Sequence, residues 1–133
     1  MKLVIDVETN GFLDTLNKVH CLVCKDTETN KLYSFNPKNI KEGLDLIKNA
    51  KTLIGHNILS FDLPALEKVY GFKFSGEVID TLLLSRLIWT NRIEQDCKLN
   101  SFPPKLIGKH SIESYGFRFG LLKGDFKDKE SFD

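Results

Sequence analysis

The first third of the chain alternates short apolar runs with polar turns, at the spacing of β-strands. Lys2 to Glu8 is apolar at nearly every position before two carboxylates, which predicts a strand covered on both faces. Val19 to Lys25 and Lys31 to Phe35 flank the turn-rich stretch Asp26 to Asn30, which predicts an antiparallel hairpin. The pattern therefore predicts three strands before the first helix.

Helical spacing appears from Asn39 onward. Asn39 is a predicted N-cap with Glu42 three residues later, the arrangement of a capping box, and apolar residues follow at helical spacing. The later predicted elements are a strand at Thr52 to Gly55, helices at Leu63 to Tyr70 and Asp80 to Trp89, a loop at Asn91 to Gly108, and a short helix at Ser111 to Tyr115 closed by Gly116. We expect an α/β fold in one domain over residues 1–133, with a mixed sheet flanked by helices.

Two carboxylates, Asp6 and Glu8, lie two residues apart in the apolar run of the first predicted strand. The period of a strand is two residues, so both side chains leave the same face. Like charges side by side cost several kcal/mol unless a cation neutralises them, and oxygen ligands suit Mg²⁺ or Mn²⁺. The pair predicts a metal site that acts on phosphate, and the alternative is a charge pair on an edge strand.

A third carboxylate, Asp62, follows the predicted strand at Thr52 to Gly55 and stands at the start of a predicted helix. Asn57 lies on the polar turn between them. We therefore predict Asp62 as a third metal ligand. Asp80 also stands at the start of a predicted helix, and we interpret it as an N-cap rather than a metal ligand.

The spacing of these groups, D-x-E near the N-terminus and N-x3-F-D from Asn57 to Asp62, resembles the first two motifs of the DEDD 3′→5′ exonucleases. The extra residue before Phe61, compared with the commoner N-x2-Y-D, is typical of the proofreading domains of podovirus-type family A DNA polymerases. Three further segments resemble the same branch: Ile79 to Leu87, Lys109 to Arg118, and Leu122 to Phe126. The resemblance covers nearly the whole chain and implies a ribonuclease H-like sheet.

The resemblance implies two-metal hydrolysis of DNA, with two Mg²⁺ or Mn²⁺ ions and release of nucleoside 5′-monophosphates. Asp6 would bridge both metals, Glu8 would bind the one that carries the hydroxide, and Asp62 would hold the leaving-group metal. The implied partners are the single-stranded 3′ end of DNA and a polymerase domain or subunit, with no membrane. The expected substrate-binding residues are Thr9, Asn10, Gly11, Phe12, Asn57 and Phe61.

Several of these residues also have a purely structural interpretation. Phe12 resembles an apolar wedge beside the last base, where stacking is worth about 1–3 kcal/mol, or it anchors its turn in the core. Asn57 is interpreted as a substrate contact rather than a turn residue, and His56 as structural. We expect Trp89 and Phe117 to be core or interface residues rather than base platforms.

The family supplies its fourth carboxylate from a Y-x3-D motif, and no tyrosine of this sequence is followed by an aspartate at that distance. The residues found there are Pro37, Phe74 and Phe119. We expect the chain to end before this motif, so that the C-terminal part of the fold is incomplete and activity is weak or absent. The alternatives are a non-catalytic DNA-binding or polymerase-associated module and a simple interaction domain.

Composition adds few constraints. Nineteen Lys and Arg balance 18 Asp and Glu, with a slightly basic second half from Arg86 onward. Without an apolar stretch near the ~20 residues of a membrane span or a signal-peptide pattern, we expect an intracellular protein, in the bacterial host cytoplasm if it is phage-encoded. The basic residues that could contact phosphate are Lys98, Lys105, Lys109, Arg118, Lys123 and Lys127, and the alternative is a solvated surface.

The three cysteines are an odd number, which predicts free thiols. Cys21 and Cys24 have the spacing of zinc ligands, but in a strand residues three apart face opposite sides. We therefore expect buried thiols and no zinc site.

Overall fold

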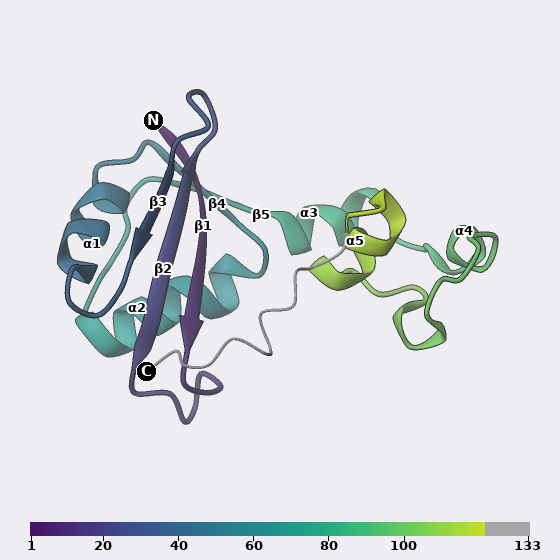
Figure 1. Cartoon of the computed structure of the whole chain (residues 1–133), viewed down its shortest axis with the longest axis horizontal. Helices are drawn as coiled ribbons and strands as arrows, with labels where there is room; N and C mark the ends of the chain where they lie inside the picture. The colour runs from purple at the N-terminus through teal and green to yellow at the C-terminus, as the bar shows by residue number, and fades with distance from the viewer. Residues whose placement is uncertain (122–133) are drawn as a thin grey trace. The chain divides into compact units, whose positions relative to one another are not determined.

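The computed structural model describes residues 1–121 (Figure 1). The segment Leu122 to Phe126 that carried part of the resemblance, and the basic residue Lys127, lie outside the described residues. The chain divides into two compact units, of which unit 1 comprises Met1–Thr81 and unit 2 begins at Leu82. That residues 1–133 form a single domain stays a prediction.

Unit 1 contains a five-stranded mixed sheet with strand order β3-β2-β1-β4-β5. Its strands are β1 (Lys2–Thr9), β2 (Val19–Asp26), β3 (Leu32–Phe35), β4 (Thr52–Gly55) and β5 (Glu77–Asp80). β1, β2 and β3 pair antiparallel, whereas β4 pairs parallel with both β1 and β5. The predicted mixed sheet is confirmed. The pattern missed β5, which has only four residues and a charged one at each end.

Helices α1 (Ile40–Lys48) and α2 (Leu63–Tyr70) contribute to one hydrophobic core with the strands. Burial along β1 alternates, with Leu3, Ile5 and Val7 in that core and Val4 41% exposed. The prediction that β1 is covered on both faces is therefore wrong, because the helical residues of this core pack on the face of β1 to which Leu3, Ile5 and Val7 point. Asp6 and Glu8 share the other face, as predicted.

Asn39 occupies the N-cap position of α1, but its side chain does not cap the helix. Its Oδ1 atom instead accepts a hydrogen bond from the backbone N–H of Asn36, at 2.7 Å. The predicted capping box is wrong, because the turn that precedes the helix engages this oxygen first. Asn36 also closes that turn through its carbonyl, which accepts from the Asn39 N–H.

Unit 2 is helical in its described part. It contains α3 (Thr81–Ile88), which starts at the end of unit 1, α4 (Ile93–Cys97), a 3₁₀ turn (Pro104–Leu106) and α5 (Ile112–Phe119). The predicted helix at Asp80 to Trp89 is confirmed to within one residue at each end. The predicted loop at Asn91 to Gly108 is wrong, because it contains α4 and the 3₁₀ turn. The short α4 has no continuous apolar stripe that a hydrophobic pattern could detect.

The last described helix, α5, runs four residues further than predicted. It ends at Gly120, in the left-handed region at φ 70°, and not at Gly116. Gly116 lies inside the helix, where a Cβ atom would stand 2.6 Å from the carbonyl oxygen of Leu121. The glycine thus permits a close approach of two backbones. Ser111 caps the helix by accepting from the Ser114 N–H.

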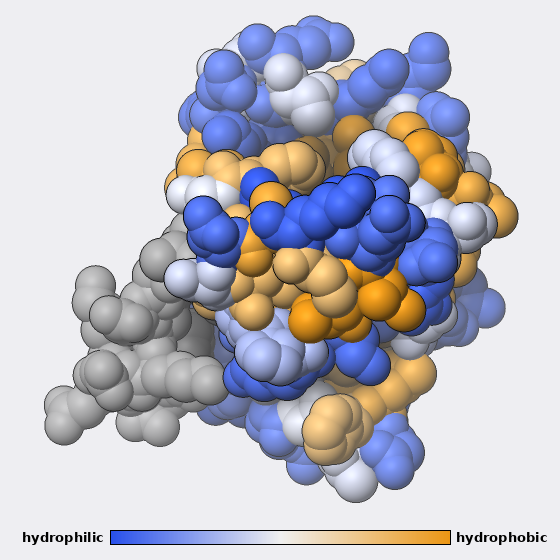
Figure 2. All heavy atoms as spheres, turned by 90° about the vertical axis from the view of Figure 1, so that its right-hand side faces the viewer, coloured by the Kyte–Doolittle hydropathy of each residue, from blue (hydrophilic) through white to orange (hydrophobic). Residues whose placement is uncertain are grey.

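Apolar side chains of unit 2 are mostly exposed, and its buried residues are mostly polar. Figure 2 shows orange apolar residues interspersed with blue hydrophilic ones on the face that it views. The large exposed apolar residues from Leu82 onward are Leu83, Leu84, Leu87, Ile88, Trp89, Ile93, Leu99, Ile112, Phe117, Phe119 and Leu121. Trp89 and Phe117 are therefore not core residues. No helix within residues 1–121 has the length and apolar character needed to cross a membrane.

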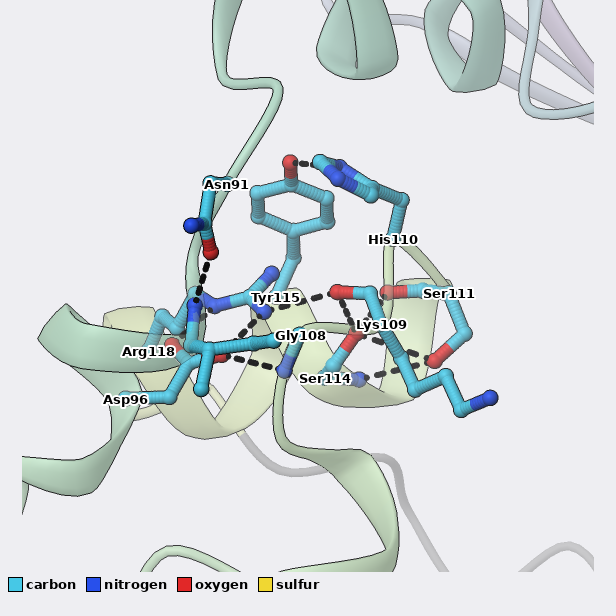
Figure 3. A network of polar contacts seen from close by, with 10 residues as sticks. Asn91, Asp96, Gly108, Lys109, His110, Ser111, Ser114, Tyr115 and Arg118 are labelled. Atoms are coloured by element: carbon cyan, nitrogen blue, oxygen red, sulfur yellow. Dashed lines mark hydrogen bonds and ion pairs between the residues drawn. The ribbon is translucent and has the colours of Figure 1, made fainter.

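The centre of unit 2 is an ion pair between α4 and α5. Arg118 donates from Nε and Nη2 to the two carboxylate oxygens of Asp96, at 2.8 and 2.7 Å, and Figure 3 shows its side chain reaching toward that carboxylate. The side chains of Arg118 and Asp96 are 3% and 0% exposed. Asp96 also accepts from the Gly108 N–H and Arg118 also donates to the Lys109 carbonyl, whereas Nη1 of Arg118 has no hydrogen-bond partner among residues 1–121. Arg118, for which the sequence left open a phosphate contact or a solvated surface position, is instead an internal structural residue.

Candidate metal and nucleic-acid site

The predicted site residues gather at the carboxyl ends of three neighbouring strands. Asp6 and Glu8 stand near the end of β1, Asn57 follows β4, and Asp80 is the last residue of β5. β1, β4 and β5 run parallel to one another, so these ends meet at one edge of the sheet. Ligands of open α/β sheets commonly bind at such an edge.

Asp62 reaches this edge from the start of α2. Its Oδ2 atom accepts a hydrogen bond of 2.9 Å from the backbone N–H of Val7, which lies between Asp6 and Glu8 on β1. β4 pairs with β1 only as far as Val4, so beyond that point the Asp62 carboxylate takes the place of a neighbouring strand. The contact brings residues 55 positions apart in the chain together.

The surroundings of Asp62 disfavour its charged form. Burial, followed by the negative charge of Asp6, raises the pKa of Asp62 from 3.8 to about 7, with a smaller contribution from Asp80. The hydrogen bond from Val7 acts in the opposite direction without cancelling this effect. Among residues 1–121 Asp62 forms no salt bridge. A buried carboxylate next to another and without a cation is the electrostatic arrangement that a bound divalent ion would stabilise.

The extra residue between Asn57 and Phe61 has a structural counterpart. Residues Ile58–Asp62 form a π-helical turn, in which the N–H of Leu63 bonds to the carbonyl of Ile58. One additional residue in a helical turn produces such a π-bulge, a feature that is frequent at functional sites. The turn follows Asn57, which is left-handed at φ 64°. The insertion is therefore absorbed locally before α2 begins.

Asp80 fixes the backbone of this turn. Its carboxylate accepts hydrogen bonds from the N–H groups of Asn57 and Leu59, at 3.0 and 3.1 Å. The sequence did not indicate this role, because it depends on β5 lying next to β4. That Asp80 also caps α3 stays a prediction.

Cys21 lies beside the carboxylates, which the sequence did not indicate either. It is the cross-strand partner of Glu8 on β2. Burial, followed by the charges of Glu8 and Asp6, raises the pKa of the Cys21 thiol. Burial raises the pKa of Cys24, which is fully buried, to about 12. All three cysteines are free, as predicted, and the fully buried Cys24 is an inert thiol.

Phe12 lies on the loop after β1 with 82% of its side chain exposed. The alternative that Phe12 anchors its turn in the core is therefore wrong. The loop is held in place by Lys68 of α2, whose ammonium group donates to the carbonyls of Leu13 and Asp14 at 2.9 and 3.1 Å. An exposed aromatic ring on a tethered loop is suited to stacking.

Two other predicted substrate contacts, Asn10 and Thr9, already form side-chain hydrogen bonds within the loop. Asn10 uses its side chain to bond Asn17 and Lys18 across the loop. Thr9 donates its hydroxyl to the Gly11 carbonyl at 2.7 Å. Both contacts shape the loop that carries Phe12.

Around the next strand, His56 contacts the Thr81 hydroxyl at 3.0 Å, in line with its interpretation as structural. The side chains of Asn57 and Phe61 are partly exposed. The Asn57 backbone N–H donates to the Asp80 carboxylate, and the Asn57 backbone is left-handed at φ 64°.

Within residues 1–121 no three His, Cys, Asp or Glu side chains are grouped so that they could hold one metal ion together. The Asp62 carboxylate bonds to the N–H of Val7, the neighbour of Asp6 in the chain, the charge of Asp6 acts on Asp62, and Glu8 follows on the same face of β1 as Asp6. The three-ligand site of Asp6, Glu8 and Asp62 stays a prediction.

Comparisons with known proteins place these features in context. No protein-family model matches the chain. The chain is 34% identical, over 140 aligned residues, to the DNA-directed DNA polymerases of Enterobacteria phage T3 and Escherichia phage T7. The alignments cover 95% of this chain, and the chain spans only 20% of the length of either polymerase.

Among solved structures, the fold is similar to the family B DNA polymerase from the hyperthermophilic archaeon Pyrobaculum calidifontis, with a TM-score of 0.59. The match covers 92% of this chain and 18% of that one, at 15% identity. At this identity it supports the fold alone, which agrees with the expected ribonuclease H-like sheet.

Proposed function

Because this chain is an exonuclease-type domain of the kind associated with phage DNA polymerases, we propose that it binds the single-stranded 3′ end of DNA and hydrolyses its last phosphodiester bond. The proposed product is a nucleoside 5′-monophosphate. The observation that carries the proposal is the buried Asp62 carboxylate, held next to Asp6 with its pKa raised to about 7. The proposed setting is beside a polymerase domain in the cytoplasm of a bacterial host, since both sequence relatives are phage polymerases.

The donor set fits Mg²⁺ or Mn²⁺, because Asp6, Glu8 and Asp62 offer only oxygen ligands. When bound, such ions would activate a water molecule and stabilise the leaving 3′-oxygen. Asp6 would contribute to holding both ions, as the resemblance implies, and its charge is the largest that acts on Asp62. Glu8 is proposed to bind on the side of the attacking water, and Asp62 on the side of the leaving group.

The loop after β1 is proposed to hold the terminal nucleotide. Phe12 would stack beside the last base, since its ring is exposed and its loop is tethered by Lys68. Thr9 and Asn10 would set the loop backbone around Gly11, as their hydrogen bonds do in the structure. The turn after β4 would contribute Asn57 and Phe61.

The expected rate is low. Residues 1–133 contain no Y-x3-D motif, so the chain supplies three of the four carboxylates of the family site. Loss of one ligand from a concerted two-metal site, together with its water-orienting tyrosine, reduces rates by on the order of several powers of ten. We therefore expect trimming only slightly above background.

The test is digestion of an oligonucleotide labelled at its 5′ end, in Mg²⁺ and in Mn²⁺, with Asp6→Ala and an EDTA reaction as controls. Slow shortening by single nucleotides from the 3′ end, abolished by both controls, supports the proposal. Binding of the oligonucleotide without Asp6-dependent shortening favours the non-catalytic module. Shortening that persists in Asp6→Ala indicates a contaminating nuclease, and an equal rate on double-stranded ends contradicts the proposed substrate.

A further inference from the structure

All three arginines of the chain lie in unit 2, at positions 86, 92 and 118, whereas unit 1 uses only lysine as its basic side chain. Between residues 82 and 121 there are six Lys and Arg against three Asp and Glu. Arginine is the basic residue best suited to phosphate and to stacking on rings, because its guanidinium is planar and weakly hydrated. The uneven distribution therefore points to unit 2 as a separate anion-binding surface.

Arg86 stands in the last turn of α3, three residues before Trp89, whose N–H continues the helical turn by bonding to the Ser85 carbonyl at 2.9 Å, and Arg92 follows Trp89 by three residues. Burial, followed by the charges of Arg118, Arg86 and Arg92, lowers the pKa of His110. Arg118 is neutralised by Asp96. Among the described residues, no carboxylate lies within salt-bridge distance of Arg86 or Arg92. Within residues 1–121 these two guanidinium groups thus form no salt bridge, and the buried Nε atom of Arg92 has no hydrogen-bond acceptor there.

Aromatic rings line the same place. The ring centroid of Tyr115 lies 6.2 Å from that of Trp89 and 5.9 Å from that of Phe119. Trp89 is 45% and Phe119 68% exposed, while Tyr115 between them is held by Arg118, 4.6 Å over its ring, and by His110, 2.9 Å from its hydroxyl. Figure 3 shows the Tyr115 hydroxyl directed at the His110 ring.

The guanidinium carbon of Arg92 lies 6.0 Å from the centre of the Trp89 ring. An exposed ring with a cation beside it is the arrangement that binds single-stranded nucleic acid without reading its sequence, because every base has a face to stack and every link carries a phosphate.

We propose that Arg86, Arg92 and Trp89, supported by Tyr115 and Phe119, form a second binding surface for single-stranded nucleic acid on unit 2. The guanidinium groups contact phosphates, and a base stacks on Trp89. This surface is independent of the carboxylate site in unit 1 and needs no metal ion. Apolar contact with another protein is the competing use of this face, and it predicts no dependence on Arg86 or Arg92.

The test is a titration of the chain with an oligo(dT) of about 12 nucleotides in EDTA, over a series of salt concentrations. Trp89 is the only tryptophan, so its fluorescence reports a base stacked at this position. We expect quenching of Trp89 and an affinity that falls as salt rises. Arg86→Ser/Arg92→Ser should weaken binding about 10-fold and reduce the slope of log K against log salt by about 1.4, at roughly 0.7 per phosphate contact.

The matched control is Lys41→Ser/Lys48→Ser, which removes the same charge from exposed lysines of α1 in unit 1, outside the proposed surface. It should weaken binding less than about 3-fold. Arg86→Lys/Arg92→Lys keeps the charge and should restore most of the salt dependence. Emission of Trp89 in the free variants checks that they fold, and Arg118 is left in place because it belongs to the structural pair.

Equal losses of affinity in the arginine and lysine variants would show that binding depends only on net charge. That result would overturn the proposed binding surface. Unchanged Trp89 emission in the wild type, or binding indifferent to salt, would also overturn it and favour a protein-docking face. Asp6→Ala should bind oligo(dT) in EDTA like the wild type. If the chain does not trim DNA but Trp89 is still quenched, the result counts against the proposed function alone. If the chain trims DNA but Trp89 is not quenched, the result counts against this surface alone.

Discussion

Asp62 of unit 1 and Asp96 of unit 2 are both buried, and their surroundings shift their pKa values in opposite directions. Asp62 of unit 1 lies next to Asp6 without a cation, and its pKa is raised to about 7. Asp96 of unit 2 is held by two hydrogen bonds from Arg118, which lower its pKa. Burial alone disfavours the charged form of both aspartates, so the charge of the neighbouring side chain decides whether the pKa rises or falls. A carboxylate with its own arginine stays charged as a structural element, whereas one left beside other carboxylates either keeps its proton or is neutralised by a cation from outside the chain.

The residues buried in the two units also differ, being mainly apolar in unit 1 and mainly polar in the described part of unit 2. Unit 1 buries aliphatic side chains from its strands and helices around Leu3, Leu22 and Leu53. In unit 2 the buried described residues are Ser85, Asp96, Leu106 and Ser114. Unit 1 is therefore stabilised mainly by removal of apolar area from water, and the described part of unit 2 by the buried Asp96–Arg118 ion pair and its hydrogen bonds.

The largest expected effect comes from breaking the ion pair of unit 2. Arg118→Met leaves Asp96 buried and uncompensated and should destabilise the unit by about 3–5 kcal/mol. Urea unfolding followed by Trp89 fluorescence measures this, since Trp89 lies in unit 2. Asp96→Asn/Arg118→Met should recover part of the loss, because no lone charge remains. A loss no greater than that of Lys105→Met at the surface would contradict a structural role for the pair.

The second largest expected effect is the pH dependence of stability that Asp62 causes. Its folded pKa of about 7 lies above the ordinary 3.8, so between these values the folded state holds a proton that the unfolded chain has released. Stability therefore falls as pH rises from about 4 to about 7, by at most about 4 kcal/mol, and stays level above.

Asp62→Asn cannot ionise and can still accept from the Val7 N–H. It should be more stable than the wild type at about pH 8 and indistinguishable near pH 4. Thermal unfolding of both proteins across this range tests the difference between the units, because Asp96→Asn should instead be less stable than the wild type at neutral pH. A wild-type stability that rises from pH 4 to 7 in parallel with Asp62→Asn would show that Asp62 is ordinarily charged.

The smallest expected effect is the response to metal. Mn²⁺ at ten times its Kd should stabilise the folded chain by about 1.4 kcal/mol and raise Tm by a few degrees. The rise should be larger at about pH 8 than at about pH 5, because Asp62 must lose its proton before it can bind. We expect at most one weakly held ion by calorimetry. Tight binding that survives Asp6→Ala, or none in the wild type, would argue against the carboxylate site.

The accuracy of the sequence-based predictions follows the two cores. β1, β4 and α2 were placed to within a residue, because each presents apolar side chains at the period of its element to an aliphatic core. α4 was missed and the end of α5 misplaced, because these helices are organised by Asp96, Ser114 and Arg118. Polar networks between distant residues leave no periodic signal. For the same reason, the sequence did not indicate that Arg118 is buried in an ion pair.

The sequence by itself determined that Asp6 and Glu8 share a face of β1, since a strand has a period of two, and its motifs indicated the exonuclease type. It also determined that every arginine lies beyond residue 81. Only the tertiary structure decided that Asp62 bonds to Val7, that Asp80 holds the turn at Asn57, and that Tyr115 packs beside Trp89. These contacts join residues far apart in the chain, and strand pairing and helix packing, not local spacing, bring them together.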